Sequence, residues 1–181
     1  MESGGVILDF GASSCSSEDK KSSLPDKNFG AACGDRNLTP EVSWTSAPYE
    51  TGSFILTITD VSREDGVHPH LLVWDIPENV SKVSLTYFIV FKTTYSGKQQ
   101  LSSSMDWRAI GAQLGSTGPY SGPCPTSQEA CIRLSLYAIA DRSLGLPEGA
   151  TYEVLHRKLE EIAEVNGRSL DSMWPLRCMT F

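Results

Sequence analysis

The sequence lacks an excess of basic residues, a long apolar run and any internal repeat. Its 181 residues contain 15 Lys and Arg against 22 Asp and Glu, a formal charge of −7. The basic residues gather into no stripe that would neutralise phosphates, so we expect no nucleic-acid partner. The longest apolar run, Tyr87–Phe91, is far shorter than the roughly 18 residues of a membrane helix, so we expect no membrane span.

The cysteines lack the spacing of a metal site. They form no C-x-x-C pair and have no companion histidine at zinc-ligand spacing, so we expect no metal and no cofactor. Their odd number leaves at least one thiol free or intermolecular. Cys15 and Cys33 flank a Ser-rich stretch, and either a disulfide joins them in an oxidising compartment or both stay free in a cytosolic protein. The five positions are Cys15, Cys33, Cys124, Cys131 and Cys178.

The first ten residues have neither a charged start nor the apolar core of a signal peptide. The chain as written is therefore expected to be cytoplasmic, or secretory if a signal peptide has been removed. Two sequons, Asn37-Leu38-Thr39 and Asn79-Val80-Ser81, weakly favour the secretory alternative.

Length and patterning predict one mostly β domain, residues 1–181, with peripheral helices. The residues before Ser53 are rich in turn formers and are expected to wrap the surface around one short strand. Thr151–Asn166 carries apolar residues at helical spacing and is predicted to be a helix. A long polar connection, Thr93–Thr126, is a candidate functional loop. The predicted strands are Val6–Phe10, Phe54–Asp60, Leu71–Ile76, Val83–Phe91 and Ile132–Ala140.

Two features carry candidate chemistry. Asp60 ends one predicted strand and His70 begins the next, so a hairpin would place a carboxylate beside an imidazole at one end of the sheet. A polar turn with an exposed histidine is the alternative. The second feature, Tyr120–Pro125, is a rigid turn whose Gly122 permits close backbone approach to a ligand. A plain Pro/Gly loop is the alternative there.

In this order, five blocks resemble the phosphatidylethanolamine-binding protein family, which includes the Raf kinase inhibitor proteins and plant flowering-time regulators. Cys33–Trp44 is similar to N-x-[ST]-P-x-[LV]-x-W, and Ser53–Leu56 leads to Asp60 as in the family. The remaining blocks are His70–Pro77, similar to H-W-x-V-x-N-I-P, Gly118–Pro125, similar to G-Y-x-G-P-C-P-P, and Leu136–Ala138, similar to L-Y-A-L.

The resemblance implies a large antiparallel sheet packed with a smaller one, a C-terminal helix, and a small anion pocket at one end. The sequence departs from the family at that pocket. The D-P-D-A-P loop is replaced by Asp60–Glu64, and H-R-Y is replaced by Ala130-Cys131-Ile132, so a histidine and a tyrosine donor are absent. Alkyl side chains that replace hydrogen-bond donors in the pocket disfavour the binding of phosphate and favour a small, largely apolar organic ligand.

Under this interpretation, His70 is the catalytic base or acid and Asp60 orients it, while the Gly122 and Cys124 backbone contacts an oxyanion. Arg63 is a candidate counter-charge, and Met105 and Trp107 are a candidate lid. The candidate ligand-binding residues are Ser62, Arg63, Tyr120, Ser121, Gly122, Pro123, Cys124, Ala130, Ile132, Met105, Trp107 and Trp174.

Three functions fit the altered pocket. The first is acid–base catalysis, such as isomerisation or cyclisation, or an accessory role in natural-product biosynthesis as in some fungal homologues. The second is lipid or organic-anion binding without chemistry, and the third is protein–protein regulation like that of the kinase inhibitors. We favour the first, with a small organic ligand as partner and a monomer or homodimer as the assembly.

Overall fold

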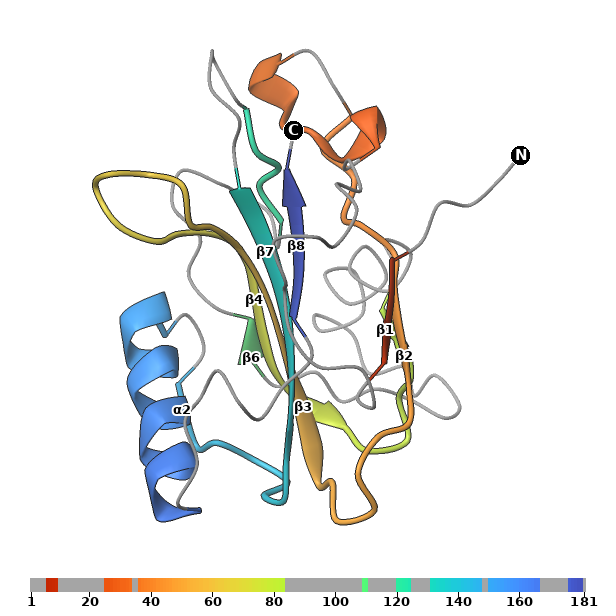
Figure 1. Cartoon of the computed structure of the whole chain (residues 1–181), viewed down its shortest axis with the longest axis vertical. Coiled ribbons are helices and arrows are strands. Elements are labelled where there is room, and N and C mark those ends of the chain that lie inside the picture. The colour runs from red at the N-terminus through yellow and green to blue at the C-terminus, as the bar shows by residue number, and fades with distance from the viewer. Residues whose placement is uncertain are drawn as a thin grey trace, which may run out of the picture.

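The computed structural model describes residues 6–9, 25–33, 36–83, 109–110, 120–124, 131–147, 150–166 and 176–180. Within them, a five-stranded sheet of order β6-β4-β3-β7-β8 lies between a three-stranded sheet, β1-β2-β5, and helix α2 (Figure 1). The large sheet comprises β3 (Ser53–Asp60), β4 (His68–Pro77), β6 (Ala109–Ile110), β7 (Cys131–Ile139) and β8 (Leu176–Thr180). The small sheet comprises β1 (Val6–Asp9), β2 (Val42–Thr45) and β5 (Lys82–Val83). Two 3-10 turns, η1 (Asp26–Asn28) and η2 (Ala31–Cys33), precede β2, and α2 spans Tyr152–Val165.

Strand β3 is buried on both faces because it lies in the middle layer. Its even-numbered side chains, such as Leu56, pack with Trp44 of the small sheet, and Ile55 packs with Leu155 and Leu159 of α2. Apolar and β-branched residues suit a strand with two buried faces, whereas strict alternation suits a strand with one wet face. All neighbouring pairs in the large sheet are antiparallel, and β1 pairs with β2 in parallel.

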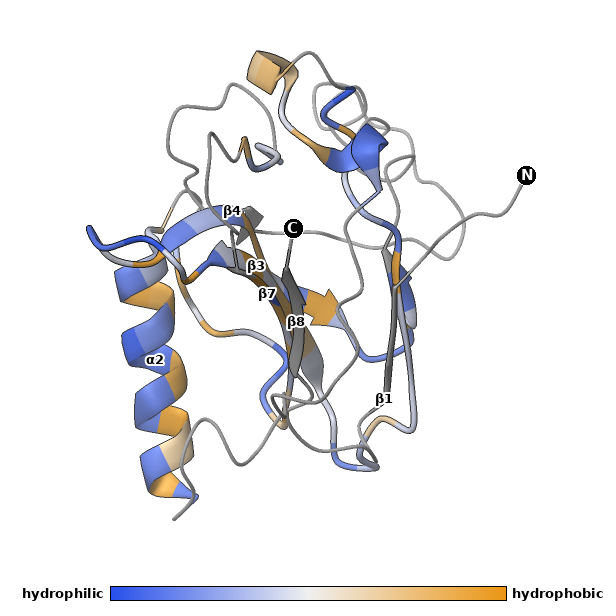
Figure 2. Cartoon of the chain, turned by 45° about the horizontal axis from the view of Figure 1, so that its top comes forward, coloured by the Kyte–Doolittle hydropathy of each residue, from blue (hydrophilic) through white to orange (hydrophobic). Residues whose placement is uncertain are grey.

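Helix α2 covers the outer face of the large sheet. Leu155, Leu159 and Ala163 are buried, and the opposite side of the helix is charged. Figure 2 shows the hydrophobic side of α2 turned toward the sheet. The helix therefore owes its place to an amphipathic stripe that the sequence shows directly.

The structure confirms the antiparallel β fold with a C-terminal helix. The predicted strands at Val6, Phe54, Leu71 and Ile132 are present, and the predicted helix differs by one residue at each end. Strands β2, β6 and β8 were not predicted, and β6 lies within the predicted connection Thr93–Thr126. Most of the predicted strand Val83–Phe91 and most of the connection Thr93–Thr126 lie outside the described residues.

A search of the described residues finds no helix with the length and hydropathy that crossing a membrane requires.

Candidate functional site

His70 occupies an irregularity at one end of the large sheet. Ile58 pairs with Leu71 and Thr59 pairs with Pro69, so His70 has no partner residue on β3. Pro69 has no N–H to donate to the ladder, which favours a break in pairing at this point. An extra residue of this kind re-aims a side chain and is common beside functional sites.

The His70 imidazole is held by the backbone of the 120–124 turn. Its Nδ1 lies 2.6 Å from the carbonyl oxygen of Ser121, and the Ser121 N–H donates to the His70 carbonyl at 3.1 Å. A carbonyl oxygen only accepts, so Nδ1 carries the hydrogen and Nε2 of the neutral ring is a bare acceptor. His70 is 6% exposed, and Nε2 is buried without a hydrogen-bond partner in the described part of the chain.

Burial lowers the pKa of His70 below its ordinary value of 6.5. The bond to Ser121 and the charge of Asp60 oppose this shift, while His68 and Arg63 add to it. The imidazole is therefore neutral at pH 7. The unfolded chain binds a proton on His70 at a higher pH than the folded chain does. The neutral imidazole therefore makes its full contribution to folding stability above pH 6.5, and this contribution declines as the pH falls toward the folded-state pKa.

Asp60 lies at the same end of the sheet as His70 but does not orient it. One oxygen of Asp60 accepts from the Ser62 N–H at 2.9 Å and from the Ser62 hydroxyl at 2.5 Å. The prediction that Asp60 orients His70 is wrong for Nδ1, because Nδ1 is hydrogen-bonded to the Ser121 carbonyl and not to Asp60. Asp60 acts on His70 through its charge, which raises the pKa of the imidazole.

Arg63 is engaged with a carboxylate of its own loop. Its Nε and one terminal nitrogen each donate to Asp65 at 2.8 Å, and both side chains are largely exposed. A bidentate pair of this kind uses the Nε edge of the guanidinium, which could otherwise hold an anion. The charge of Arg63 is therefore paired with Asp65 in this structure.

The 120–124 turn is fixed from behind by the segment 25–40. The Asn37 side chain donates to the Tyr120 carbonyl at 3.2 Å and accepts from the Gly122 N–H at 2.7 Å. The Tyr120 hydroxyl donates to the Asn28 carbonyl at 2.8 Å, and the Gly30 N–H donates to the Pro123 carbonyl at 3.0 Å. The turn is thus positioned by residues more than eighty positions away in sequence.

Gly122 permits a close approach, but of the protein's own backbone. A Cβ on Gly30 would lie 2.6 Å from the Gly122 carbonyl oxygen, and a Cβ on Gly122 would collide with the Asn28 carbonyl. The predicted approach of Gly122 to a ligand is therefore replaced by packing against the segment 28–30. The predicted oxyanion contact is also wrong at Gly122, since its N–H already donates to Asn37.

A disulfide joins Cys33 to Cys124 with a Cα–Cα distance of 5.6 Å. The predicted alternative of a Cys15–Cys33 bridge is wrong, because Cys33 is paired with the turn. The bond closes a sequence separation of 91 residues and ties η2 to the 120–124 turn. Figure 1 shows these two segments side by side at the end of the sheet that carries His70.

Ile132 lies opposite Asp60 in the large sheet and belongs to its hydrophobic core. The two residues are register partners on β7 and β3, and Ile132 is fully buried. Four further predicted residues lie outside the described residues: Ala130, Met105, Trp107 and Trp174.

Sequence reasoning missed Asn28 and Asn37 as site-shaping residues. Asn37 was interpreted as a sequon, although it stands in the N-x-[ST]-P block and close to Cys33. Its φ of 52° is a left-handed conformation that Asn tolerates better than most residues. The N-x-[ST]-P motif therefore marked Asn37 as a residue of interest, but the sequence did not show that Asn37 binds the 120–124 turn.

Comparisons with known proteins agree with this architecture. The family model described as phosphatidylethanolamine-binding protein matches residues 14–167. A curated relative, the UPF0098 protein of Aquifex aeolicus, is 28% identical over 129 residues, which are 70% of this chain and 68% of the relative.

Two solved structures share the fold. The crystal structure of E. coli YbcL, described as a member of the mammalian PEBP family, has a TM-score of 0.62 at 14% identity and covers 87% of this chain and 90% of its own. A phosphatidylethanolamine-binding protein homologue from Chlamydia trachomatis has a TM-score of 0.59 at 19% identity, covering 98% and 97%.

Proposed function

The chain belongs to the phosphatidylethanolamine-binding protein family, and from that premise we propose that its His70 site binds a small, largely apolar organic molecule through a hydroxyl or N–H donor. One observation carries the proposal, namely the buried Nε2 of His70 with no partner in the described part of the chain. A buried acceptor without a partner costs about 1–3 kcal/mol, which a donor on a ligand recovers.

The charges around the site disfavour an anion. The imidazole is neutral because burial lowers the pKa of His70, and Asp60 adds a negative charge beside it. The N–H groups of Ser121 and Gly122 already donate within the protein. The donors that a phosphate needs are thus occupied, while an acceptor is free.

The same acceptor suits acid–base chemistry. In its neutral form, Nε2 can take a proton from a bound hydroxyl or carbon acid, and the Ser121 carbonyl then stabilises the imidazolium through Nδ1–H. Isomerisation and cyclisation need only such a proton transfer in a shaped apolar site, without a cofactor. Ile132 offers an alkyl side chain at the register position opposite Asp60.

A binding experiment with phenol and inorganic phosphate tests the proposal. Nitrogen-15 NMR should show that phenol perturbs Nε2 of His70, while phosphate at the same concentration leaves it unchanged. His70→Phe keeps a ring but removes both nitrogens, and should weaken phenol binding about tenfold, as expected for a buried hydrogen bond of roughly 1.4 kcal/mol.

The matched control is His156→Phe on α2, which should bind phenol as the unaltered protein does. Phosphate binding more tightly than phenol, or equal binding by His70→Phe, would contradict the proposal.

A further inference from the structure

A cavity lies at the end of the large sheet opposite to His70. It has a volume of about 280 Å³ and is lined by residues of β2, β3 and the β4–β5 connection. The cavity includes Phe54 at the start of β3, whereas the His70 site adjoins Asp60 at its end, so about 20 Å separate them along the strand. Its principal lining residues are Trp44, Ala47, Phe54, Glu78, Val80 and Ser81.

The walls combine an apolar base with an unsatisfied donor. Trp44 and Phe54 pack with ring centroids 5.1 Å apart, and Val80 adds an alkyl surface. Trp44 is 3% exposed, and its indole Nε1 is buried without a hydrogen-bond partner in the described ranges. Buried donors of this kind are rare and mark a place where a water or a ligand oxygen completes the bonding.

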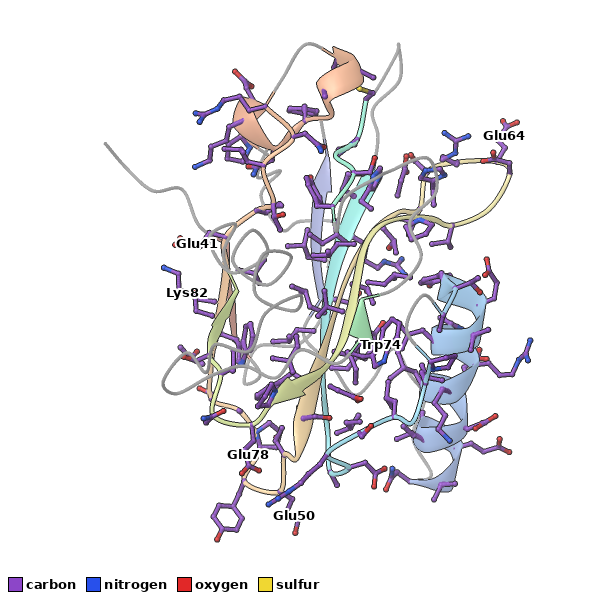
Figure 3. All side chains as sticks on the ribbon, turned by 180° about the vertical axis from the view of Figure 1, so that it is seen from behind. Glu41, Glu50, Glu64, Trp74, Glu78 and Lys82 are labelled. Atoms are coloured by element: carbon purple, nitrogen blue, oxygen red, sulfur yellow. A yellow bond between two sulfur atoms is a disulfide. The ribbon has the colours of Figure 1, made fainter. Side chains whose placement is uncertain are left out.

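The mouth of the cavity carries an unpaired negative charge. Glu78 is exposed and makes no ion pair within the described chain, while Glu50 lies at the same end of the molecule (Figure 3). The neighbouring cation Lys82 is bound to Glu41 at 2.8 Å. Ser46, also in the lining, has a φ of 59°, a strained backbone of the kind that clusters at ligand sites.

We propose that this cavity binds a small organic ammonium whose aromatic body carries an oxygen acceptor. The apolar body packs on Trp44 and Phe54, the ammonium faces Glu78, and the oxygen accepts from Trp44 Nε1. Aromatic rings also attract cations, so the walls and the carboxylate favour the same charge.

The volume limits the size of the ligand. About 280 Å³ is the space of roughly nine liquid waters and lies just below the usual range for ligand pockets. One ring with a short amine side chain fits this space, whereas a whole phospholipid does not.

Three related probes test each part of the ligand. Tyramine carries the ring, the ammonium and the oxygen, 4-ethylphenol lacks the ammonium, and phenethylamine lacks the oxygen. NMR should show tyramine shifting the indole N–H signal of Trp44, assigned with Trp44→Phe. We expect 4-ethylphenol to bind about threefold more weakly, because Glu78 is exposed, and phenethylamine about fivefold more weakly.

The key variant is Glu78→Gln, which keeps the shape of the side chain and removes its charge. It should reduce the preference for tyramine over 4-ethylphenol, while Glu64→Gln, on the hairpin at the other end of the molecule (Figure 3), leaves that preference unchanged. Failure of tyramine to shift the Trp44 signal, or an unchanged preference in Glu78→Gln, would overturn the inference. His70→Phe should leave the tyramine-induced shift of the Trp44 signal intact, so this readout is independent of the His70 site.

Discussion

Replacing Cys33 and Cys124 together with serine is expected to lower the free energy of unfolding by about 4.6 kcal/mol. The disulfide closes a separation of 91 residues, and the chain-entropy model assigns about that stabilisation to a loop of this length. The effect should also reach the ligand site, because the bond fixes the turn that holds His70 through Ser121.

Denaturant unfolding under non-reducing conditions measures this loss. Cys15→Ser is the matched control and should unfold as the unaltered protein does, since Cys33 is bonded to Cys124. A loss in Cys15→Ser as large as in the double variant would show that the pairing is wrong. Peptide mapping without reduction should recover Cys33 and Cys124 in one linked fragment.

Asn37→Ala is expected to cost about 3 kcal/mol of stability. The change removes the bonds to Tyr120 and Gly122 and leaves a carbonyl and an N–H without partners, each worth about 1–3 kcal/mol when buried. Alanine also tolerates the φ of 52° poorly, which adds roughly 1 kcal/mol.

Two companion variants separate these causes in thermal and denaturant unfolding. Asn37→Gly loses the same side-chain bonds but accepts the backbone conformation, so it should be more stable than Asn37→Ala by about 1 kcal/mol. Asn37→Asp keeps the acceptor for Gly122 and should lose less than either. An Asn37→Ala protein as stable as the unaltered chain would contradict the role of Asn37 in fixing the 120–124 turn.

Patterns within short segments of the sequence correctly predicted the strands and the helix whose burial is visible in their own residues. The apolar residues of β3 and the stripe Leu155 and Leu159 on α2 reflect burial that each segment expresses by itself. Strand β2 escaped prediction because four residues beside Pro40 carry too little periodicity to separate a strand from a loop.

The site was harder to predict because long-range pairing builds it. Asp60 and His70 are close in sequence, and their shared end of the sheet was foreseen from the hairpin. The group that orients His70 is the Ser121 carbonyl, which lies 51 residues away in sequence. It is a backbone group, so no pattern of side chains in the sequence indicates it. Cys33 was assigned the nearer Cys15 as a possible partner, whereas the fold brings Cys124 to it.

The resemblance to the family supplied what periodicity could not. Counting along the L-Y-A-L block placed Ile132 at a position where the family has a donor, and the structure sets this residue opposite Asp60. The sequence did not indicate what the N–H groups of the 120–124 turn bind. Whether the Gly122 N–H binds a ligand or Asn37 depends on how Asn37 packs against the turn.

The protonation of His70 tests the central claim most directly. A nitrogen-15 NMR titration from pH 8 downward should show hydrogen on Nδ1 and a bare Nε2, with the ring staying neutral below its ordinary pKa of 6.5. An imidazole that carries its hydrogen on Nε2, or one whose pKa lies at or above 6.5, would contradict the account of a buried acceptor awaiting a donor.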